Sequence, residues 1–349
     1  MRLASIVVVA AALTLAAPAA AAVHLRGTAY EFNSTPVIAG ATIRVAELPS
    51  ARAVTRADGS YELAVPDRHR ITPYIVAPGY HTVYLQTFTT AGQDLANVNF
   101  QTPTENVYKA LVALLGVPVD ANGDVSQCAI VSTFNTRNVR DLDYRQFRAY
   151  GAHGVPGATA FGVPTLPPAT YFNASVLPDP SQPVSSEDGG VVWVAVAPGT
   201  YRISGKAPGT AFAPFTATCA PGRVVNANPP WGLYQLSPAS PAQLTARWEG
   251  TTLRSLRVAN LPAGSTLRAS CAGAGCPFAQ RKTRPRGSSV TWLRDTRFRA
   301  GQTLEVTASS HAYNATVRRY RIAGTGTPRG RTLCVPDGLS RPQRRCRTG

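Results

Sequence analysis

The side chains with the clearest binding chemistry in this sequence are the arginines of its C-terminal third. Residues 237–349 carry 20 basic and 4 acidic side chains, a net charge of +16, whereas residues 23–236 carry 14 of each and are neutral. Guanidinium groups donate paired hydrogen bonds that match carboxylate and phosphate oxygens, and a field of one sign concentrates ions of the other. The charge distribution therefore predicts an anion-binding segment, with a merely solvated basic surface as the alternative.

Eight basic residues of this segment are candidate anion contacts. Residues i and i+2 of a β-strand point to the same face, so Arg297 with Arg299, and Arg319 with Arg321, are expected to project together. Outside the cell the matching partner is an anionic cell-wall polymer or polysaccharide, and no specific nucleic acid is expected. The candidates are Arg281, Lys282, Arg284, Arg286, Arg297, Arg299, Arg319 and Arg321.

A second kind of binding chemistry comes from aromatic residues in the middle of the chain. Trp231 follows two prolines, with Tyr234 close behind it, and a proline-rich loop carries Tyr171 and Phe172. Flat aromatic rings suit the apolar faces of pyranose sugars, so these four residues are candidate sugar contacts. The alternative is that Trp231 closes the end of a β-sandwich and that Tyr171 covers its core.

One short segment has the spacing of calcium ligands. Asp120, Asn122 and Asp124 place oxygen atoms at alternate positions, as at the start of a calcium-binding loop. The pattern then fails, because Val125 stands where such a loop needs glycine and Val131 where it needs a closing acid. A simple turn is the favoured interpretation, so no metal and no cofactor are predicted.

The sequence contains little that indicates catalysis. Its five histidines do not form the His-Glu-x-x-His spacing of zinc peptidases, and His153 alone lies in a loop of functional character. It has no Gly-x-Ser-x-Gly elbow for a nucleophilic serine. A non-enzymatic protein is therefore predicted, with a remote metalloenzyme as the least favoured alternative.

The first 22 residues have the features of a secretory signal peptide. Arg2 provides a positive charge, residues 3–15 form an apolar run, and Ala20-Ala21-Ala22 is a small-residue cleavage site. No later segment reaches the length of a transmembrane helix. The composition is rich in arginine, alanine, glycine and proline, which is typical of a GC-rich bacterial genome. Secretion, or retention in a bacterial cell envelope, is therefore expected.

Six cysteines in an exported chain predict disulfides. Fifteen connectivities exist for six cysteines, and the spacing favours neighbours along the chain. The expected pairs are Cys128–Cys219, Cys271–Cys276 and Cys334–Cys346.

Short alternating segments between many glycines and prolines predict an all-β protein of tandem β-sandwich domains. Two sandwiches are expected at 23–102 and 125–236, joined by a helical connector at 103–124. A basic Ig-like β-sandwich module is expected at 237–323, and an Arg/Gly-rich tail with a disulfide loop at 324–349. Within this plan, Asp58-Gly59 predicts a β-hairpin, and the apolar run Val191–Val196 predicts a central strand.

Two helices are expected. In the connector, Thr102 is the expected cap, Gly116 the terminator, and Val107, Leu111, Leu114 and Leu115 the apolar stripe that packs between the first two domains. A shorter helix is expected at 143–150, because Asp143 and Gln146 have the spacing of a capping box.

Two stretches of the chain share an order of turn signals. Gly40-Ala41-Thr42, Asp58-Gly59 and Ala77-Pro78-Gly79 recur as Gly157-Ala158-Thr159, Asp188-Gly189 and Ala207-Pro208-Gly209. The step from Asp-Gly to Ala-Pro-Gly is 19 positions in both. A shared spacing of turns predicts that one backbone plan is used twice.

The same signals, with Tyr-x-Leu-x-Val-Pro at 61–66 and Pro-Gly-Tyr at 78–80, resemble the carboxypeptidase regulatory-like domain, a transthyretin-like (prealbumin-like) β-sandwich. The resemblance covers about 23–102 and, more loosely, about 150–215, where Val191–Val196 replaces the tyrosine-containing signature. It implies two prealbumin-like domains with scaffold and binding duties, in some members carbohydrate binding, and no chemistry of their own. Residues 253–322 are similar to a C-terminal module of exported bacterial proteins.

Together these patterns predict an exported, non-enzymatic, modular β-sandwich protein held electrostatically on an anionic cell envelope or matrix. The alternative is a carbohydrate-binding protein that uses the aromatic residues of the second domain. Salt separates the two hypotheses, because it screens charge pairs and leaves ring stacking intact. The oligomeric state is left open by the sequence.

Overall fold

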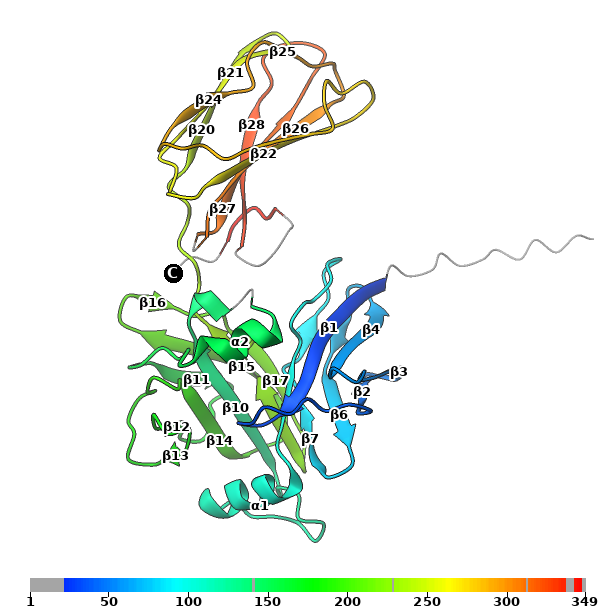
Figure 1. Cartoon of the computed structure of the whole chain (residues 1–349), viewed down its shortest axis with the longest axis vertical. Helices are drawn as coiled ribbons and strands as arrows, with labels where there is room; N and C mark the ends of the chain where they lie inside the picture. Colours follow the sequence, from blue (N-terminus) through cyan, green and yellow to red (C-terminus); the bar gives the residue numbers. More distant parts are fainter. Residues whose placement is uncertain (1–21, 140–141, 228, 312, 337–341, 347–349) are drawn as a thin grey trace, which may run out of the picture.

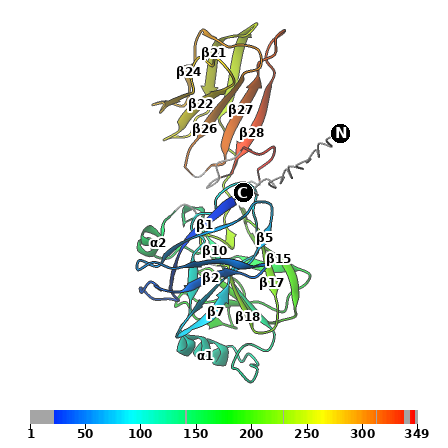
Figure 2. The same ribbon diagram turned by 90° about the vertical axis from the view of Figure 1, so that its right-hand side faces the viewer.

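The computed structural model describes residues 22–139, 142–227, 229–311, 313–336 and 342–346. Nearly all of the expected signal peptide, residues 1–21, lies outside the described residues. The described chain is built from strands, with two α-helices and one 3-10 turn (Arg137–Val139), and forms β-sandwiches in tandem (Figures 1 and 2). The all-β prediction is confirmed.

The first sandwich packs two sheets around a core formed by residues 23–100. One sheet has the order β4-β1-β9 and the facing layer the order β3-β2-β6-β7, while β5 and β8 pair as a small ribbon. In β4, Tyr61, Leu63 and Val65 are buried and the residues between them are not, so the predicted alternation is confirmed. The bounds are β1 Ala22–Glu31, β2 Thr42–Val45, β3 Leu48–Val54, β4 Ser60–Pro66, β5 Arg70–Ile71, β6 Pro73–Ala77, β7 Tyr80–Tyr84, β8 Phe88–Thr89 and β9 Phe100–Thr102.

The second sandwich repeats this plan around its own core. One layer has the order β13-β12-β14-β10-β18, with β19 paired to β10, and the facing layer contains β11, β15, β16 and β17. β14 lies between β12 and β10 with most of its residues buried, which confirms the predicted central strand. The bounds are β10 Cys128–Asn135, β11 Thr159–Val163, β12 Thr170–Phe172, β13 Pro178–Asp179, β14 Gly190–Val196, β15 Gly199–Ala207, β16 Thr210–Ala211, β17 Phe215–Cys219, β18 Arg223–Ala227 and β19 Leu233–Tyr234.

The two sandwiches share one continuous sheet. β18 of the second pairs in parallel with β7 of the first, through Val224 opposite Val83 and Val225 opposite Tyr84. A ten-stranded sheet therefore runs through both units, and the sheets β4-β1-β9 and β11-β15-β17 cover different parts of it. The sandwiches expected at 23–102 and 125–236 are therefore joined through a shared sheet.

The repeated Gly-Ala-Thr turn makes matching hydrogen bonds in the two sandwiches. The Ala41 amide donates to the Thr55 hydroxyl at 2.9 Å, and the Ala158 amide donates to the Ser185 hydroxyl at 2.8 Å. Each hydroxyl in turn donates to a backbone carbonyl at 2.7 Å. The shared backbone plan predicted from turn spacing is present at the level of single hydrogen bonds.

The Asp-Gly turns also occupy matching places, but the first does not make the predicted hairpin. The Ala29 amide donates to Gly59 O at 2.9 Å, and the Phe134 amide donates to Gly189 O at 2.8 Å, so each turn lies against the first strand of its unit. After Asp58-Gly59 the chain changes layer, because β3 pairs with β2 and β4 pairs with β1. The Asp-Gly turn could be predicted from the local sequence, whereas the strand with which β4 pairs could not.

Helix α1 (Glu105–Leu114) begins two residues later than predicted. Its N-cap is Thr104, whose hydroxyl accepts from the Val107 amide at 3.3 Å. Leu114, expected in the apolar stripe, is 57% exposed, and Tyr108 and Val112 face the protein instead. α1 lies across the end of the ten-stranded sheet, at the bottom of Figure 1, where its apolar side meets residues of both sandwiches.

Helix α2 (Tyr144–Tyr150) forms where the capping box predicts it. Asp143 accepts from the Gln146 amide at 2.9 Å, and the Gln146 side chain accepts from the Asp143 amide at 3.0 Å. In the described part of the chain, neither helix is long and apolar enough to cross a membrane.

The basic C-terminal module is a separate sandwich, shown at the top of Figure 1. A four-stranded sheet, β20, β21, β24 and β25, packs on a five-stranded sheet of order β23-β22-β26-β27-β28 around its own core. Residues 330–335, expected within a tail, form the edge strand β28 instead. The bounds are β20 Gln243–Glu249, β21 Thr252–Ala259, β22 Thr266–Ala272, β23 Gln280–Thr283, β24 Val290–Trp292, β25 Thr296–Arg297, β26 Thr303–Ser309, β27 Ala315–Arg321 and β28 Gly330–Val335.

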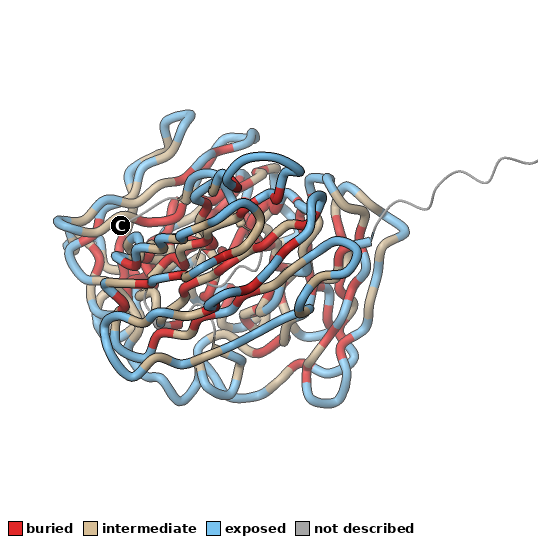
Figure 3. The backbone as a smooth tube through the Cα atoms, turned by 90° about the horizontal axis from the view of Figure 1, so that it is seen from above, coloured by how far each residue is buried: buried red, intermediate tan, exposed pale blue. Residues whose placement is uncertain are grey.

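All six cysteines are paired as predicted. The bonds are Cys128–Cys219, Cys271–Cys276 and Cys334–Cys346. Viewed from above, buried segments alternate with exposed ones along the strands, as expected for sheets that each cover a core with one face (Figure 3).

Gly27 lies in β1 where another segment crosses closely. A Cβ atom on Gly27 would lie 2.0 Å from the carbonyl oxygen of Val98. Gly27→Ala is therefore expected to lower the free energy of unfolding by about 1–3 kcal/mol, because the backbone must shift. Urea denaturation would compare it with Gly287→Ala, whose Cβ meets nothing within 4 Å. Equal stability of the two variants would contradict the prediction.

Candidate functional site

The basic residues of the C-terminal module divide between its two sheets. On the five-stranded sheet, Arg268 lies opposite Lys282, and Glu305 lies opposite Arg319. These residues alternate with core residues such as Leu304 and therefore occupy the outer, solvent-facing side of the sheet. Of the eight predicted anion contacts, this outer face brings together Lys282, Arg319 and Arg321.

The other five predicted contacts lie elsewhere. The Arg281 guanidinium stacks over the Phe278 ring at 4.9 Å. Arg284 and Arg286 are exposed in the loop after β23, Arg297 belongs to β25 of the opposite sheet, and Arg299 lies beside Gly275. The predicted pair Arg319 and Arg321 does project into one hollow, whereas Arg297 and Arg299 are not on one strand.

A hollow at the end of the outer face collects four arginines. The hollow has a volume of about 680 Å³ and is lined in part by the turn 323–328. Its four arginines are Arg319 and Arg321 of β27, Arg329 just before β28, and Arg331 within β28. We call this the arginine hollow. Sequence reasoning missed Arg329 and Arg331, although their i, i+2 spacing was the available signal, because it assigned them to a tail.

The charges of the arginine hollow are mostly uncompensated. Glu305 accepts from Arg319 Nε at 2.7 Å and from its Nη2 at 2.6 Å. In the part of the chain that the structure describes, no carboxylate lies within 4.0 Å of the guanidinium nitrogens of Arg321, Arg329 or Arg331. Arg319 and Arg331 also lie directly opposite each other on neighbouring strands. Like charges in that position repel, and an anion between them would remove the repulsion.

A second hollow continues the same outer face. It has a volume of about 500 Å³, and its lining includes Arg268, Lys282, Glu305 and Tyr313. Glu305 borders this hollow and binds Arg319 of the first one. The face therefore carries two hollows with an excess of positive charge, linked by the Glu305–Arg319 ion pair, which suits an extended anionic chain.

The four candidate sugar contacts do not form one platform. Tyr171 is 6% exposed within the second core, and its hydroxyl accepts from the Ala160 amide. Trp231 packs edge-on against Phe88 at 5.0 Å and donates to Ala96 O at 3.3 Å, so it fills the junction between the sandwiches. Tyr234 belongs to β19, beside β10. Phe172 borders a cavity between the two sandwiches, but its ring is as buried as that of Tyr171, at 5% exposed.

The Asp120–Asp124 segment forms a hydrogen-bonded turn. Asp120 Oδ1 accepts from the Asn122 amide at 2.8 Å and from the Asp124 amide at 3.0 Å. Asp124 lies instead near the buried His81, with 4.0 Å between its Oδ1 and the ring Nδ1. Across the described ranges, no group of three or more His, Cys, Asp or Glu side chains is placed to hold a metal ion.

His153 is held in a wall of the second sandwich. Its ring contacts the Phe147 ring at 4.8 Å, and burial lowers its pKa to about 4. The imidazole is therefore neutral at physiological pH. Asp188 and His153 line the same cavity between the two sandwiches. Burial raises the pKa of Asp188, and the hydrogen bond that its carboxylate accepts from the Gly190 amide at 3.0 Å partly offsets this rise.

Comparisons with known proteins give only distant likenesses. No family model matches the sequence, and no curated protein matches it. Among solved structures, the chain is similar to a Streptococcal ancillary pilin, at 8% identity and a TM-score of 0.19, over 94% of this chain and 100% of that one. It is also similar to the chicken CNTN1 FN1-FN3 domains, at 10% identity and a TM-score of 0.15, over 86% of this chain and 89% of that one.

A third likeness is to the BSP domain of a biofilm associated protein. The identity is 12% and the TM-score 0.18, over 82% of this chain and 57% of that one. Similarity at this level does not inform function, which rests on the geometry of the site.

Proposed function

We propose that this chain is an exported, non-enzymatic binding protein that attaches to an anionic polymer of the cell envelope or matrix through its C-terminal module. The observation that carries the proposal is the arginine hollow, where three of four guanidinium groups lack a carboxylate partner in the described chain. Planar guanidinium groups on two paired strands present forked donors to carboxylate or phosphate. The two N-terminal sandwiches are then presented away from the attachment surface.

Three disulfides support the exported part of this proposal. Disulfides persist in oxidising compartments and are rare in the cytosol, and all six cysteines are paired. The carboxypeptidase regulatory-like resemblance is consistent with a scaffold role for the first sandwich, in which Gly40, Asp58 and Gly59 form the turns of its signature.

Charge reversal in the arginine hollow tests the attachment. The variant Arg321→Glu/Arg329→Glu/Arg331→Glu is expected to bind polygalacturonate and polyphosphate at least tenfold more weakly than the native chain, measured by calorimetry at low salt. Binding by the native chain should itself weaken about tenfold or more between about 50 and 200 mM salt, as ion release predicts.

A matched control separates the hollow from the overall net charge. Arg284→Glu/Arg286→Glu/Arg297→Glu makes the same change of six charge units at exposed positions of the same module, outside the hollow. It is expected to keep most of the affinity. Equal loss in the two triple variants, or binding that is independent of salt, would contradict a localised anion site.

A further inference from the structure

The outer face of the five-stranded sheet in the C-terminal module carries a single acidic residue. The strands β23, β22, β26, β27 and β28, all within the described residues, contain Glu305 and no other aspartate or glutamate. Glu305 lies on β26, the central strand of this sheet, and β22, β26, β27 and β28 lie side by side in Figure 2. A lone carboxylate in the middle of a basic face gives that face a charge pattern that a ligand must match.

The strand register places basic residues on both sides of Glu305. On one side, Arg268 of β22 lies opposite Lys282 of β23. On the other side, Arg319 of β27 lies opposite Arg331 of β28, at the arginine hollow. Glu305 itself lies opposite Arg319 on the neighbouring strand. Two basic clusters therefore flank one strand whose only charged side chain is negative.

The basic cluster away from the arginine hollow is open to a ligand. Arg268 and Lys282 are exposed, and in the part of the chain that the structure describes no carboxylate lies within 4.0 Å of their side-chain nitrogens. Both residues line the second hollow together with Glu305. An anionic ligand therefore has two places to bind on this face, one on each side of β26.

Between the two clusters, the face offers hydroxyl groups in place of basic side chains. Ser270 lies opposite Glu305, and Thr307 lies opposite Arg268 on the same outer face. Ser270, Thr307 and Glu305 all line the second hollow. The Glu305 side chain is 24% exposed, so its carboxylate meets a ligand that crosses the sheet. These groups suit a neutral sugar, whose hydroxyls donate and accept hydrogen bonds, whereas the carboxylate repels an anion.

The spacing of the strands sets the spacing of the ligand charges that fit this pattern. Neighbouring strands lie about 5 Å apart, which is close to the length of one sugar residue. Only β26 separates β22 from β27, so the two basic clusters begin about 10 Å apart, a distance of about two sugar residues. A chain with a charge on every sugar would place one charge over Glu305. Two like charges about one strand spacing apart in water lower an affinity by roughly three- to fourfold.

From this pattern we infer that the five-stranded face selects an acidic polysaccharide in which a charged sugar alternates with a neutral one. The inference rests on the proposed function and names the class of polymer that the module binds. The polysaccharide crosses the strands, with carboxylates over β22 and β27 and a neutral sugar over Glu305. Glu305 is then a specificity-determining residue, and it also holds Arg319 in place by accepting from its Nε at 2.7 Å and its Nη2 at 2.6 Å.

Removing the charge of Glu305 tests the inference. The native chain and Glu305→Gln are titrated by calorimetry at low salt with a galacturonate dimer, a galacturonate octamer and a hyaluronan octasaccharide, in which charged and neutral sugars alternate. Glu305→Gln is expected to strengthen binding of the galacturonate octamer at least threefold more than binding of the hyaluronan octasaccharide. The dimer is short enough to bind in the arginine hollow alone, so it measures the gain that comes from releasing Arg319.

Glu249→Gln is the matched control. Glu249 lies on β20 of the opposite sheet and accepts from Arg254 Nε and Nη2, each at 2.6 Å, so the variant makes the same change of charge and breaks the same kind of ion pair. It should change the affinities for the two longer ligands by the same factor. A second variant, Arg268→Gln/Lys282→Gln, should weaken binding of the hyaluronan octasaccharide at least fivefold and leave the dimer unchanged, because only the longer ligand reaches both clusters.

Two results would overturn this inference and leave the proposed function in place. One is that, in Glu305→Gln, the gain for the galacturonate octamer exceeds the gain for the hyaluronan octasaccharide by less than threefold. The other is that Arg268→Gln/Lys282→Gln binds the hyaluronan octasaccharide as tightly as the native chain does. If none of the three ligands binds the native chain, the proposed function fails and this inference fails with it.

Discussion

Replacing Cys128 and Cys219 together by alanine is expected to lower the free energy of unfolding by about 4–5 kcal/mol. The bond closes a loop of 91 residues, and the entropy that a disulfide removes from the unfolded chain grows with the length of the loop. It also joins β10 of the ten-stranded sheet to β17 of the facing sheet, so it fastens the two layers of the second sandwich.

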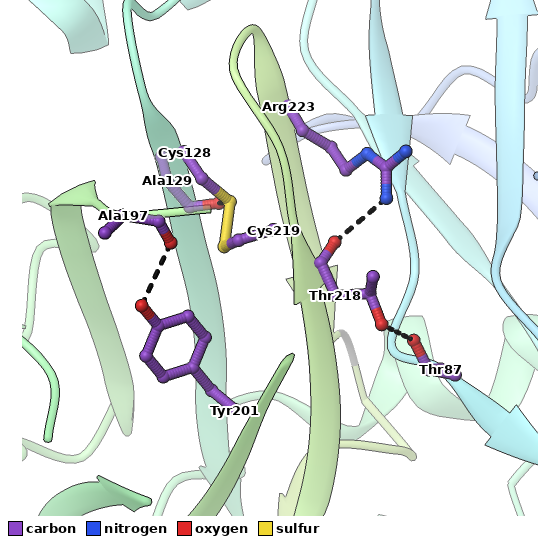
Figure 4. Close-up of a disulfide and its surroundings, with 8 residues drawn as sticks. All are labelled: Thr87, Cys128, Ala129, Ala197, Tyr201, Thr218, Cys219 and Arg223. Carbon is purple, nitrogen blue, oxygen red and sulfur yellow. Dashed lines mark hydrogen bonds between the residues drawn. A yellow bond between two sulfur atoms is a disulfide. The ribbon is translucent and has the colours of Figure 1, made fainter. Parts of the chain in front are cut away.

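The surroundings of this disulfide connect it to the first sandwich. Beside Cys219, the Thr218 hydroxyl shares a 2.7 Å hydrogen bond with the Thr87 hydroxyl, and Thr218 O accepts from Arg223 at 3.0 Å (Figure 4). Cys128 and Cys219 are 1% and 5% exposed, so alanine also leaves unfilled space. Loosening β17 is therefore expected to weaken the junction as well.

Urea denaturation followed by circular dichroism measures the loss. The matched control is the alanine pair at Cys271 and Cys276, which closes a loop of only five residues and is expected to cost about 2 kcal/mol by the same relation. A smaller effect at Cys128–Cys219 than at Cys271–Cys276 would show that loop entropy does not govern the stability of this chain.

The features predicted best from the sequence are those fixed by local chemistry. Gly40 and Gly157 have φ of 72° and 74°, a conformation that glycine adopts readily, so their spacing reported a real repeat. The capping box at Asp143 and the Cys271–Cys276 disulfide, whose cysteines are five positions apart, are local in the same sense. Each depends on a few residues whose side chains bond within the same segment.

What the sequence did not reveal depends on pairing between distant segments. Nothing in Val83 or Val224 marks the two strands as neighbours, because an apolar edge strand looks like any other strand in the sequence. The arginine hollow has the same origin: Arg319 and Arg331 meet only because β27 pairs with β28 in one register. The cavity of about 460 Å³ between the two sandwiches likewise needs residues from both of them.

The two N-terminal sandwiches are expected to unfold as one cooperative unit, separately from the C-terminal module. Each core includes an aromatic residue of the other unit: Trp231 packs on the first core and Tyr84 on the second. The Gly232 amide also donates to the Gln86 side chain at 2.8 Å across the junction. The C-terminal module stands apart in Figure 1, and its core includes no residue before Ala242.

Trp231→Ala is the substitution that exposes this coupling most directly. Removing the indole eliminates its contact with Phe88 and its hydrogen bond to Ala96 O, and is expected to lower the free energy of unfolding of the joint unit by about 3 kcal/mol. Calorimetry of the native chain should show two transitions, and in the variant the joint transition should move to lower temperature without splitting.

The matched control is Trp248→Ala in the C-terminal module, where the indole packs on Phe298 and Tyr320. It should shift only the other transition, because mutations in units without shared contacts act independently. Two results would mean that the shared sheet does not couple the two cores. One is three transitions in the native chain. The other is a Trp231→Ala variant in which one sandwich melts early while the other keeps its native transition. Coupling of this kind also keeps α2 in place, because a sandwich that opened alone would separate Tyr144 of α2 from Tyr30 of β1.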